Sequence, residues 1–231
     1  MGLEKKVALV TGGAGALGTV IVQRLLQEGA SVAATYHAEH EKLPASSPKL
    51  KWMNADVTRE EDVVRLFDDV LATFGRVDIL VNTVGGFVPG KHVANTPLAD
   101  WEKMMTLNLR STFLCMREGL RRMKGQPYGR IISIAAMIAL KPSAGKSAYT
   151  ISKAGVVLLT EIAAEEQKGT GITINAIAPS IILTKGNAES MPGDDTTKWV
   201  KPEEIAGILY FLCSDVAGSI TGTTIRASGG L

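Results

Sequence analysis

Near its start, the chain places an unbroken apolar segment directly before a glycine-rich turn and a helical pattern. Residues 7–10 are all apolar, which is typical of a strand buried on both faces of a sheet. Small residues in the turn let the backbone approach a pyrophosphate, which would then lie at the helix N-terminus. The segment therefore predicts an α/β fold that binds a dinucleotide. Its candidate cofactor residues are Thr11, Gly12, Gly13, Gly15, Ala16, Leu17 and Gly18.

Strand and helix patterns alternate through the rest of the chain. Further strands are expected at residues 31–35, 50–54, 77–82, 129–136, 171–177 and 223–227. Helices are expected from the end of the glycine-rich turn to about residue 28 and at residues 59–74, 98–124, 147–168 and 202–213. This alternation predicts a Rossmann-like, doubly wound parallel sheet of about seven strands with helices on both faces. With 231 residues, the chain suits one domain spanning residues 1–231, and the polar segment 183–199 is expected to be a mobile lid.

The charge and cysteine patterns exclude several classes of protein. The 25 basic and 23 acidic residues are scattered, so no nucleic-acid or membrane surface is expected. No apolar run approaches the roughly 18 residues of a membrane span, and the N-terminus shows no apolar signal core. Cys115 and Cys213 match no metal or redox spacing. We therefore expect no metal site, a small-molecule substrate and a cytoplasmic protein.

The residues that follow the next strands are the other candidates for cofactor binding. An acidic residue after the second strand would receive the adenosine ribose and favour NAD(H), but Tyr36 and His37 stand there. Tyr36 can stack on adenine and His37 can meet a 2′-phosphate, which favours NADP(H) and leaves NAD(H) as an alternative. Both could instead be ordinary surface residues. The later candidates are Asp56, Val57, Asn82, Thr83, Val84 and Gly85.

Tyr149 and Lys153 are four residues apart in a predicted helix, so both side chains share one face. A phenol has a pKa of about 10 in water, and an ammonium beside it would lower that value. The pair is therefore a candidate acid–base group near neutral pH. The spacing alone is more often an ordinary helix surface. Asn108 is the third catalytic candidate, because asparagine inside a helix is unfavourable by propensity.

With these motifs in order, the chain resembles the short-chain dehydrogenase/reductase family from end to end. The resemblance implies that Tyr149 is the general acid and that Lys153 holds the nicotinamide ribose. It implies that Asn108 anchors a water that relays protons. It also implies a homodimer or homotetramer formed through the long helices. The residues implied to line the nicotinamide are Pro179, Ser180, Ile182 and Thr184.

The chain departs from the family pattern at four positions. Ala16, Thr83 and Ser180 replace a glycine, an asparagine and a second glycine of that pattern. The family serine that donates a hydrogen bond to the substrate oxygen lies thirteen residues before the tyrosine, and this position is Ala136. Nearby serines 133, 143 and 147 are out of register.

The missing serine and the substrate-side segments resemble the dihydropteridine reductase branch of this family. Phe87 follows a paired glycine, and Met191 lies in the expected lid, followed by Trp199. Phe87, Ala136 and Met191 are therefore the substrate-side candidates. The leading hypothesis is a reductase of activated C=N or C=O compounds such as quinonoid dihydropterin. The alternatives are a general ketone or 3-oxoacyl reductase and a non-catalytic nucleotide sensor.

Overall fold

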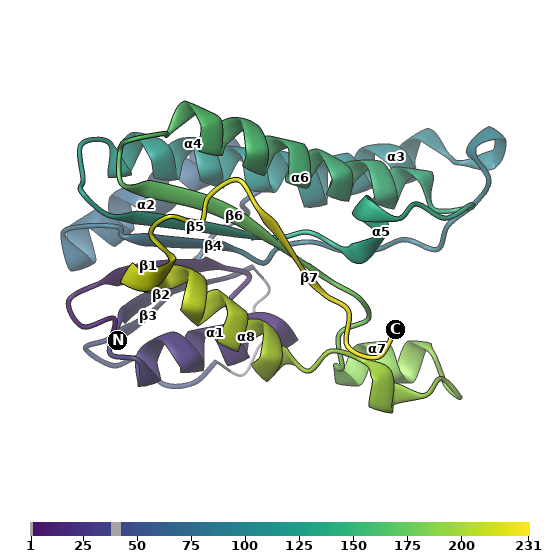
Figure 1. Cartoon of the computed structure of the whole chain (residues 1–231), viewed down its shortest axis with the longest axis horizontal. Coiled ribbons are helices and arrows are strands. Elements are labelled where there is room, and N and C mark those ends of the chain that lie inside the picture. The colour runs from purple at the N-terminus through teal and green to yellow at the C-terminus, as the bar shows by residue number, and fades with distance from the viewer. Residues whose placement is uncertain (1, 38–42) are drawn as a thin grey trace.

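One parallel sheet organises the computed structural model, which describes residues 2–37 and 43–231. In this part of the chain seven strands pair in the order β3-β2-β1-β4-β5-β6-β7 (Figure 1). They are β1 (Val7–Thr11), β2 (Ser31–Tyr36), β3 (Leu50–Asn54), β4 (Ile79–Asn82), β5 (Gly129–Ile134), β6 (Ile172–Pro179) and β7 (Thr224–Ala227). The predicted Rossmann-like fold is confirmed.

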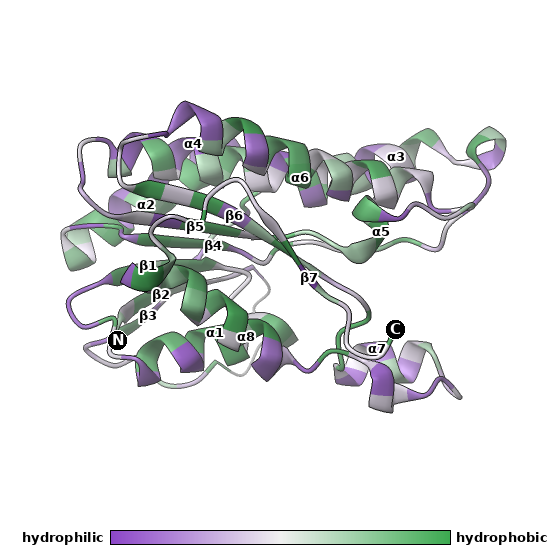
Figure 2. Cartoon of the chain, in the orientation of Figure 1, coloured by the Kyte–Doolittle hydropathy of each residue, from purple (hydrophilic) through white to green (hydrophobic). Residues whose placement is uncertain are grey.

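Helices cover both faces of the sheet. On one face lie α1 (Ala16–Gln27) and α8 (Pro202–Cys213), and on the other lie α2 (Glu60–Phe74), α4 (Ser111–Met123) and α6 (Ser147–Glu166) (Figure 1). Ala8 and Val10 belong to the apolar core under α1 and α8, whereas Val7 and Leu9 belong to the core under α2 and α4. Successive residues of a strand point to opposite faces. Both faces of a strand covered twice are therefore buried, which explains the unbroken apolar run at residues 7–10, and the helices carry a mixture of hydrophilic and hydrophobic residues (Figure 2).

The helix expected at residues 98–124 contains a π-helical segment that the sequence did not predict. It consists of α3 (Leu98–Met104), the π-helical η2 (Met105–Arg110) and α4. A π segment alters the i→i−4 ladder of backbone bonds. Here the hydroxyls of Ser111 and Thr112 donate to the carbonyls of Leu107 and Asn108, at 2.6 Å and 2.8 Å. Asn108 therefore lies in the irregular part of this helix.

Several predicted strand and helix ends differ from the structure by one or two residues, because these ends depend on tertiary contacts. The strand expected at residues 129–136 ends at Ile134, and a short helix, α5 (Met137–Leu140), follows it. The segment at residues 183–199 contains α7 (Lys185–Ser190) and the 3₁₀ turn η3 (Thr196–Lys198), and its role as a mobile lid stays a prediction. A bridge between Ile182 and Val200 joins its two ends, and Trp199 is buried.

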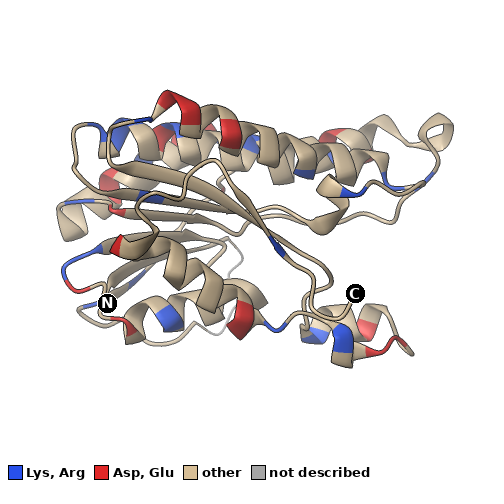
Figure 3. Cartoon of the chain, viewed as in Figure 1, with Lys and Arg blue, Asp and Glu red and all other residues tan. Residues whose placement is uncertain are grey.

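Charged residues lie mainly on the helices and the connecting loops (Figure 3). Within residues 2–37 and 43–231, no helix is both long and apolar enough to cross a membrane. The same residues contain no group of three or more His, Cys, Asp or Glu side chains that could hold a metal ion.

Candidate active site

A cavity of about 280 Å³ opens at the carboxyl ends of β1, β2 and β4. From β1 the chain continues to β2 and β3 on one side of the sheet and then returns to β4 on the other side of β1. Open parallel sheets bind ligands at such a switch point. The lining residues are Gly12, Ala14, Gly15, Thr35, Tyr36, His37, Ala55, Asp56, Val57, Thr58, Thr83, Val84, Gly85 and Leu107. Nine of these were predicted cofactor residues.

The glycine-rich turn brings its backbone to the cavity wall. Gly12 has φ +66°, and a Cβ there would lie 2.9 Å from Thr83 Oγ1. A Cβ on Gly18 would lie 2.1 Å from the Gly12 carbonyl oxygen, and one on Gly13 would lie 2.7 Å from Ala34 Cβ. Gly13 and Gly18 therefore shape the turn rather than line the cavity.

Helix α1 presents an uncapped N-terminus beside this turn. Its N-cap, Gly15, supplies no side-chain hydrogen bond, and its first turn, which begins with Ala16 and Leu17, contains no acidic residue. The first N–H groups of a helix have no intrahelical partner and favour an anion. The turn and α1 together fit the pyrophosphate of a dinucleotide.

Thr83 joins the end of β4 to the glycine-rich turn. Its hydroxyl donates to the Thr11 carbonyl at 2.6 Å, while the Thr11 hydroxyl donates to the Val81 carbonyl at 3.4 Å. Asn82 is buried and donates to Ser133 Oγ at 3.2 Å. Thr11 and Asn82 therefore support the floor of the site and do not line the cavity.

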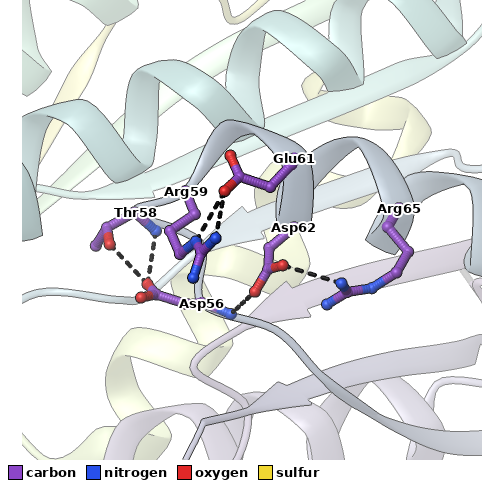
Figure 4. Close-up of polar contacts among 6 residues, drawn as sticks. All are labelled: Asp56, Thr58, Arg59, Glu61, Asp62 and Arg65. Atoms are coloured by element: carbon purple, nitrogen blue, oxygen red, sulfur yellow. Dashed lines mark hydrogen bonds and ion pairs between the residues drawn. The ribbon is translucent and has the colours of Figure 1, made fainter.

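The side of the cavity nearest β2 and β3 carries Tyr36, His37 and Asp56. Asp56 accepts hydrogen bonds from the backbone N–H and hydroxyl of Thr58, at 2.9 Å and 2.7 Å (Figure 4). Burial tends to raise the pKa of Asp56, but the Thr58 hydrogen bonds and the charge of His37 outweigh it, so the pKa lies below its ordinary value. A positive charge on His37 therefore lies close enough to Asp56 to lower the pKa of that carboxyl.

The charged side chains next to Asp56 are already paired. Asp62 accepts from the Asp56 N–H at 3.0 Å and pairs with Arg65, while Arg59 pairs with Glu61 (Figure 4). These arginines therefore have carboxylate partners within α2 and its approach.

Tyr149 and Lys153 lie on α6 as predicted, but their electrostatics differ from the expectation. Lys153 is buried and donates to the Ile134 carbonyl at 2.8 Å, and burial lowers its pKa to about 8. Burial also raises the pKa of Tyr149. The expected lowering of the Tyr149 pKa is therefore wrong in the absence of a bound cofactor. Burial of the phenol outweighs the effect of Lys153, whose ammonium is hydrogen-bonded to the Ile134 carbonyl.

Phe87 contacts the Tyr149 ring edge to face, with ring centroids 5.2 Å apart and an interplanar angle of 85°. Among the described residues, none forms a hydrogen bond with the Tyr149 hydroxyl. The phenol is therefore free to donate to a bound molecule.

Asn108 is buried and bonds to the loop that follows β4. Its Oδ1 accepts from the Gly86 N–H at 2.8 Å, and its Nδ2 donates to the Gly86 carbonyl at 3.1 Å and to Ser152 Oγ at 3.0 Å. A Cβ on Gly85 would lie 2.9 Å from Asn108 Oδ1 and 3.0 Å from Lys153 Nζ. Asn108 and Lys153 therefore both lie against Gly85, and Asn108 also bonds Gly86.

The position of the missing serine is a buried corner between β5 and α5. Ala136 caps α5 and is 7% exposed. Ser133 lies inside β5, and Ser147 Oγ is 3.5 Å from Thr96 Oγ1. Neither hydroxyl occupies the Ala136 position.

The residues after β6 lie outside the cavity lining. Pro179 ends β6, and the Ser180 hydroxyl donates to the Ser228 carbonyl at 2.8 Å. Ile182 forms the bridge to Val200, and Thr184 caps α7, with Met191 at the other end of that helix. Contacts of these residues with a nicotinamide or a substrate remain predictions.

Sequence reasoning missed five residues of the cavity wall, which are Ala14, Thr35, Ala55, Thr58 and Leu107. Thr35 accepts the Gly12 N–H at 2.8 Å, so its hydroxyl sets the turn. A hydroxyl at the last buried position of the second strand was the available signal. Leu107 gave none, because its place depends on η2.

The chain is similar to known proteins over almost its whole length. The family model described as enoyl-(acyl carrier protein) reductase matches residues 12–231. "Nodulation protein G" of Azospirillum brasilense is 33% identical, with 99% of both chains covered. "3-oxoacyl-[acyl-carrier-protein] reductase FabG" of Aquifex aeolicus is 31% identical, with 99% of this chain and 98% of that protein covered.

Solved structures give the same result. A Serratia marcescens short-chain dehydrogenase/reductase mutant has a TM-score of 0.88 and 31% identity, with 100% of this chain and 99% of that chain covered. The structure titled "ElxO with NADP Bound" has a TM-score of 0.90 and 27% identity, with 97% and 98% covered. The chain belongs to the short-chain dehydrogenase/reductase family. It is an oxidoreductase of a family that uses nicotinamide cofactors.

Proposed function

We propose that the chain transfers hydride from NADPH to an activated C=N or C=O acceptor, with Tyr149 as the proton donor. The observation that carries this proposal is Ala136, which places a methyl group where the family pattern has a hydroxyl donor. A single donor stabilises a developing oxyanion less well than two. An acceptor that spreads the charge over a conjugated system needs the second donor least. Quinonoid dihydropterin and quinones belong to this chemical class.

The cavity fits the cofactor that this reaction needs. The uncapped α1 N-terminus would hold the pyrophosphate, and Tyr36 and His37 would hold the adenosine end. The bound cofactor supplies the hydride. Lys153 would hold the nicotinamide ribose, and the Tyr149 phenol would give its proton to the acceptor atom. The segment 183–199 would cover the nicotinamide and exclude water, with Pro179, Ser180, Ile182 and Thr184 near its base.

A panel of acceptors tests the proposal directly. The panel contains quinonoid dihydropterin, menadione and a simple ketone, each with NADPH and with NADH. We expect kcat/KM for the best activated acceptor to exceed that for the ketone by about 100-fold, which is the usual cost of one oxyanion donor. Equal values for the ketone and the activated acceptors would contradict the proposal.

Reduction of 3-oxoacyl thioesters is the second candidate. It is favoured by the relatives named 3-oxoacyl-[acyl-carrier-protein] reductase, which match nearly the whole chain. Acetoacetyl-CoA in the same panel separates the two candidates. If this thioester is the best acceptor, the 3-oxoacyl reductase assignment replaces the first.

We expect tighter binding of NADPH than of NADH, and a preference that grows as the pH falls. The residues at the end of β2 that line the cavity are Tyr36 and His37, and neither carries a negative charge that would repel the 2′-phosphate. Histidine gains positive charge as the pH falls across the physiological range, so its attraction for the phosphate rises. Dissociation constants of both cofactors measured from about pH 8 to about pH 5.5 check this.

The His37→Ala variant should lose the pH-dependent part of the preference. His92→Ala is the matched control, because His92 lies outside the residues that line the cavity. Tighter binding of NADH at every pH would show that the cofactor assignment is wrong.

The outer surface of α4 and α6 supports a homodimer or homotetramer. Phe113, Ile151, Leu158 and Ile162 are large apolar side chains on these helices, and each is exposed. We expect Leu158→Glu to lower the sedimentation coefficient toward that of a monomer, because a charge in an apolar contact is costly. Identical sedimentation of the variant and the wild type would contradict this interface.

The two buried free thiols, Cys115 and Cys213, suit a reducing compartment such as the cytoplasm.

A further inference from the structure

A closed series of contacts passes through Tyr149, and we call it the Tyr149 circuit. Its members are Gly86, Phe87, Tyr149, Ser152 and Asn108. We infer that Ser152 and Phe87 are positioning residues that hold the Tyr149 phenol in place for proton donation. This inference rests on the proposed role of Tyr149 as the proton donor.

The buried half of the circuit is polar. Asn108 Nδ2 donates to Ser152 Oγ at 3.0 Å, and Ser152 Oγ donates to the Tyr149 carbonyl at 2.8 Å. Asn108 and Ser152 are both fully buried. Their hydrogen bonds are therefore shielded from competition by water, and each depends on the other.

The other half of the circuit passes through the loop after β4. Asn108 bonds both backbone polar groups of Gly86, at 2.8 Å and 3.1 Å. Gly86 is followed directly by Phe87, whose ring meets the Tyr149 ring at 5.2 Å. Phe87 is 52% exposed, so it contributes little to the core, whereas its ring has a defined edge-to-face contact with Tyr149.

Both the backbone and the ring of Tyr149 therefore contact groups that are linked to Asn108. Ser152 fixes its backbone and Phe87 fixes its ring, and Asn108 holds both of these partners. A proton donor displaced by about 1 Å can lose about 100-fold in rate. Once one link of a closed circuit is broken, breaking a second link adds little. The effects of Ser152 and Phe87 on the rate should therefore be strongly non-additive, although the two side chains lie on different segments.

The test uses Ser152→Ala, Phe87→Leu and the double variant of the full-length protein. Single-turnover hydride transfer is measured with saturating NADPH and the best acceptor of the panel. We expect each single variant to lose about tenfold, and the double variant to lose about tenfold rather than about 100-fold. The dissociation constant of NADPH should not change, because neither side chain lines the cofactor cavity.

A second measurement needs no acceptor. The phenolate band of Tyr149 is followed near 295 nm during a pH titration, with Tyr149→Phe identifying the band. Burial raises the pKa of Tyr149, so a freed ring should ionise at lower pH in both single variants. A side chain that served stability alone would change the melting temperature without moving this titration.

Two control variants remove equivalent groups outside the circuit. Thr160→Val deletes a buried hydroxyl on α6 that donates to the Val156 carbonyl at 2.8 Å. Phe211→Leu replaces an exposed ring on α8. Both should leave the rate and the Tyr149 titration unchanged.

The two proposals fail in distinguishable ways. If the double variant loses the product of the single losses, or if neither variant moves the Tyr149 titration, the circuit does not position Tyr149. Should Ser152→Ala fail to fold, Phe87→Leu alone must still shift the titration and slow the reaction, or the inference is overturned. If Tyr149→Phe keeps the wild-type rate, the proposed proton donor is wrong whatever the circuit does to the titration.

Discussion

Tyr149→Phe is expected to lower the rate of hydride transfer by about 10²–10⁴, the usual contribution of general acid catalysis. The phenol lacks a hydrogen-bond partner among the described residues, and burial raises its pKa. It therefore stays protonated near neutral pH and is available to an acceptor atom. The edge-to-face ring contact with Phe87 is kept in the variant, so the loss should come from the missing proton.

Single-turnover kinetics with NADPH and a cofactor titration check this result. The titration should be nearly unchanged, because Tyr149 lies outside the cofactor cavity. Tyr210→Phe removes a phenol from α8 and should keep the wild-type rate. A Tyr149→Phe rate above about a tenth of wild type would assign the proton donor to another group.

Ala136→Ser is expected to raise kcat/KM for a simple ketone by about 10²–10³, the usual value of one oxyanion donor. The same change should affect a quinone or quinonoid dihydropterin far less, since those acceptors disperse the charge themselves. Ala136 caps α5 with φ −160° and ψ 151°, an extended conformation that serine adopts readily and favours at an N-cap. The variant should therefore fold.

The comparison requires kcat/KM for one ketone and one activated acceptor in both proteins. Ala139→Ser adds the same hydroxyl to α5, on a side chain that packs in the small core of Val156 and Ala178, and should not increase ketone reduction. If Ala136→Ser leaves the ratio of the two acceptors unchanged, the absent hydroxyl does not set the substrate class.

The sequence predicts well the features that depend on neighbours in the chain. The segment from β1 to α1 and the pairing of Tyr149 with Lys153 on one helix follow from local spacing alone. The π-helical η2 does not follow from local spacing. The hydrogen bonds between Asn108 and Gly86 do not either, because these residues are 22 positions apart. The direction of the Tyr149 pKa also required the fold, since burial decides it.

The family resemblance identified Ala136 as the position of the missing donor, but it gave no information about the surroundings of this residue. Three serines lie near this position in the sequence, and all three were judged to be out of register. The structure places Ser133 inside β5 and Ser147 beside Thr96. Register within a strand and contact between loops decide such questions, and neither is visible in local periodicity.

The residues of the cavity wall and the residues proposed to act on the acceptor come from different parts of the chain, which affects how the substrate of such a protein can change in evolution. Every residue that lines the cavity lies between Gly12 and Leu107, whereas Tyr149, Lys153 and Ala136 come from later segments. A substitution at Ala136 can therefore change acceptor choice while leaving every residue of this cavity wall unchanged. The two halves meet at Gly85, because a Cβ there would lie 2.9 Å from Asn108 Oδ1 and 3.0 Å from Lys153 Nζ. We therefore expect substitutions that change the acceptor preference to be tolerated at Ala136, and any side chain at Gly85 to be tolerated poorly.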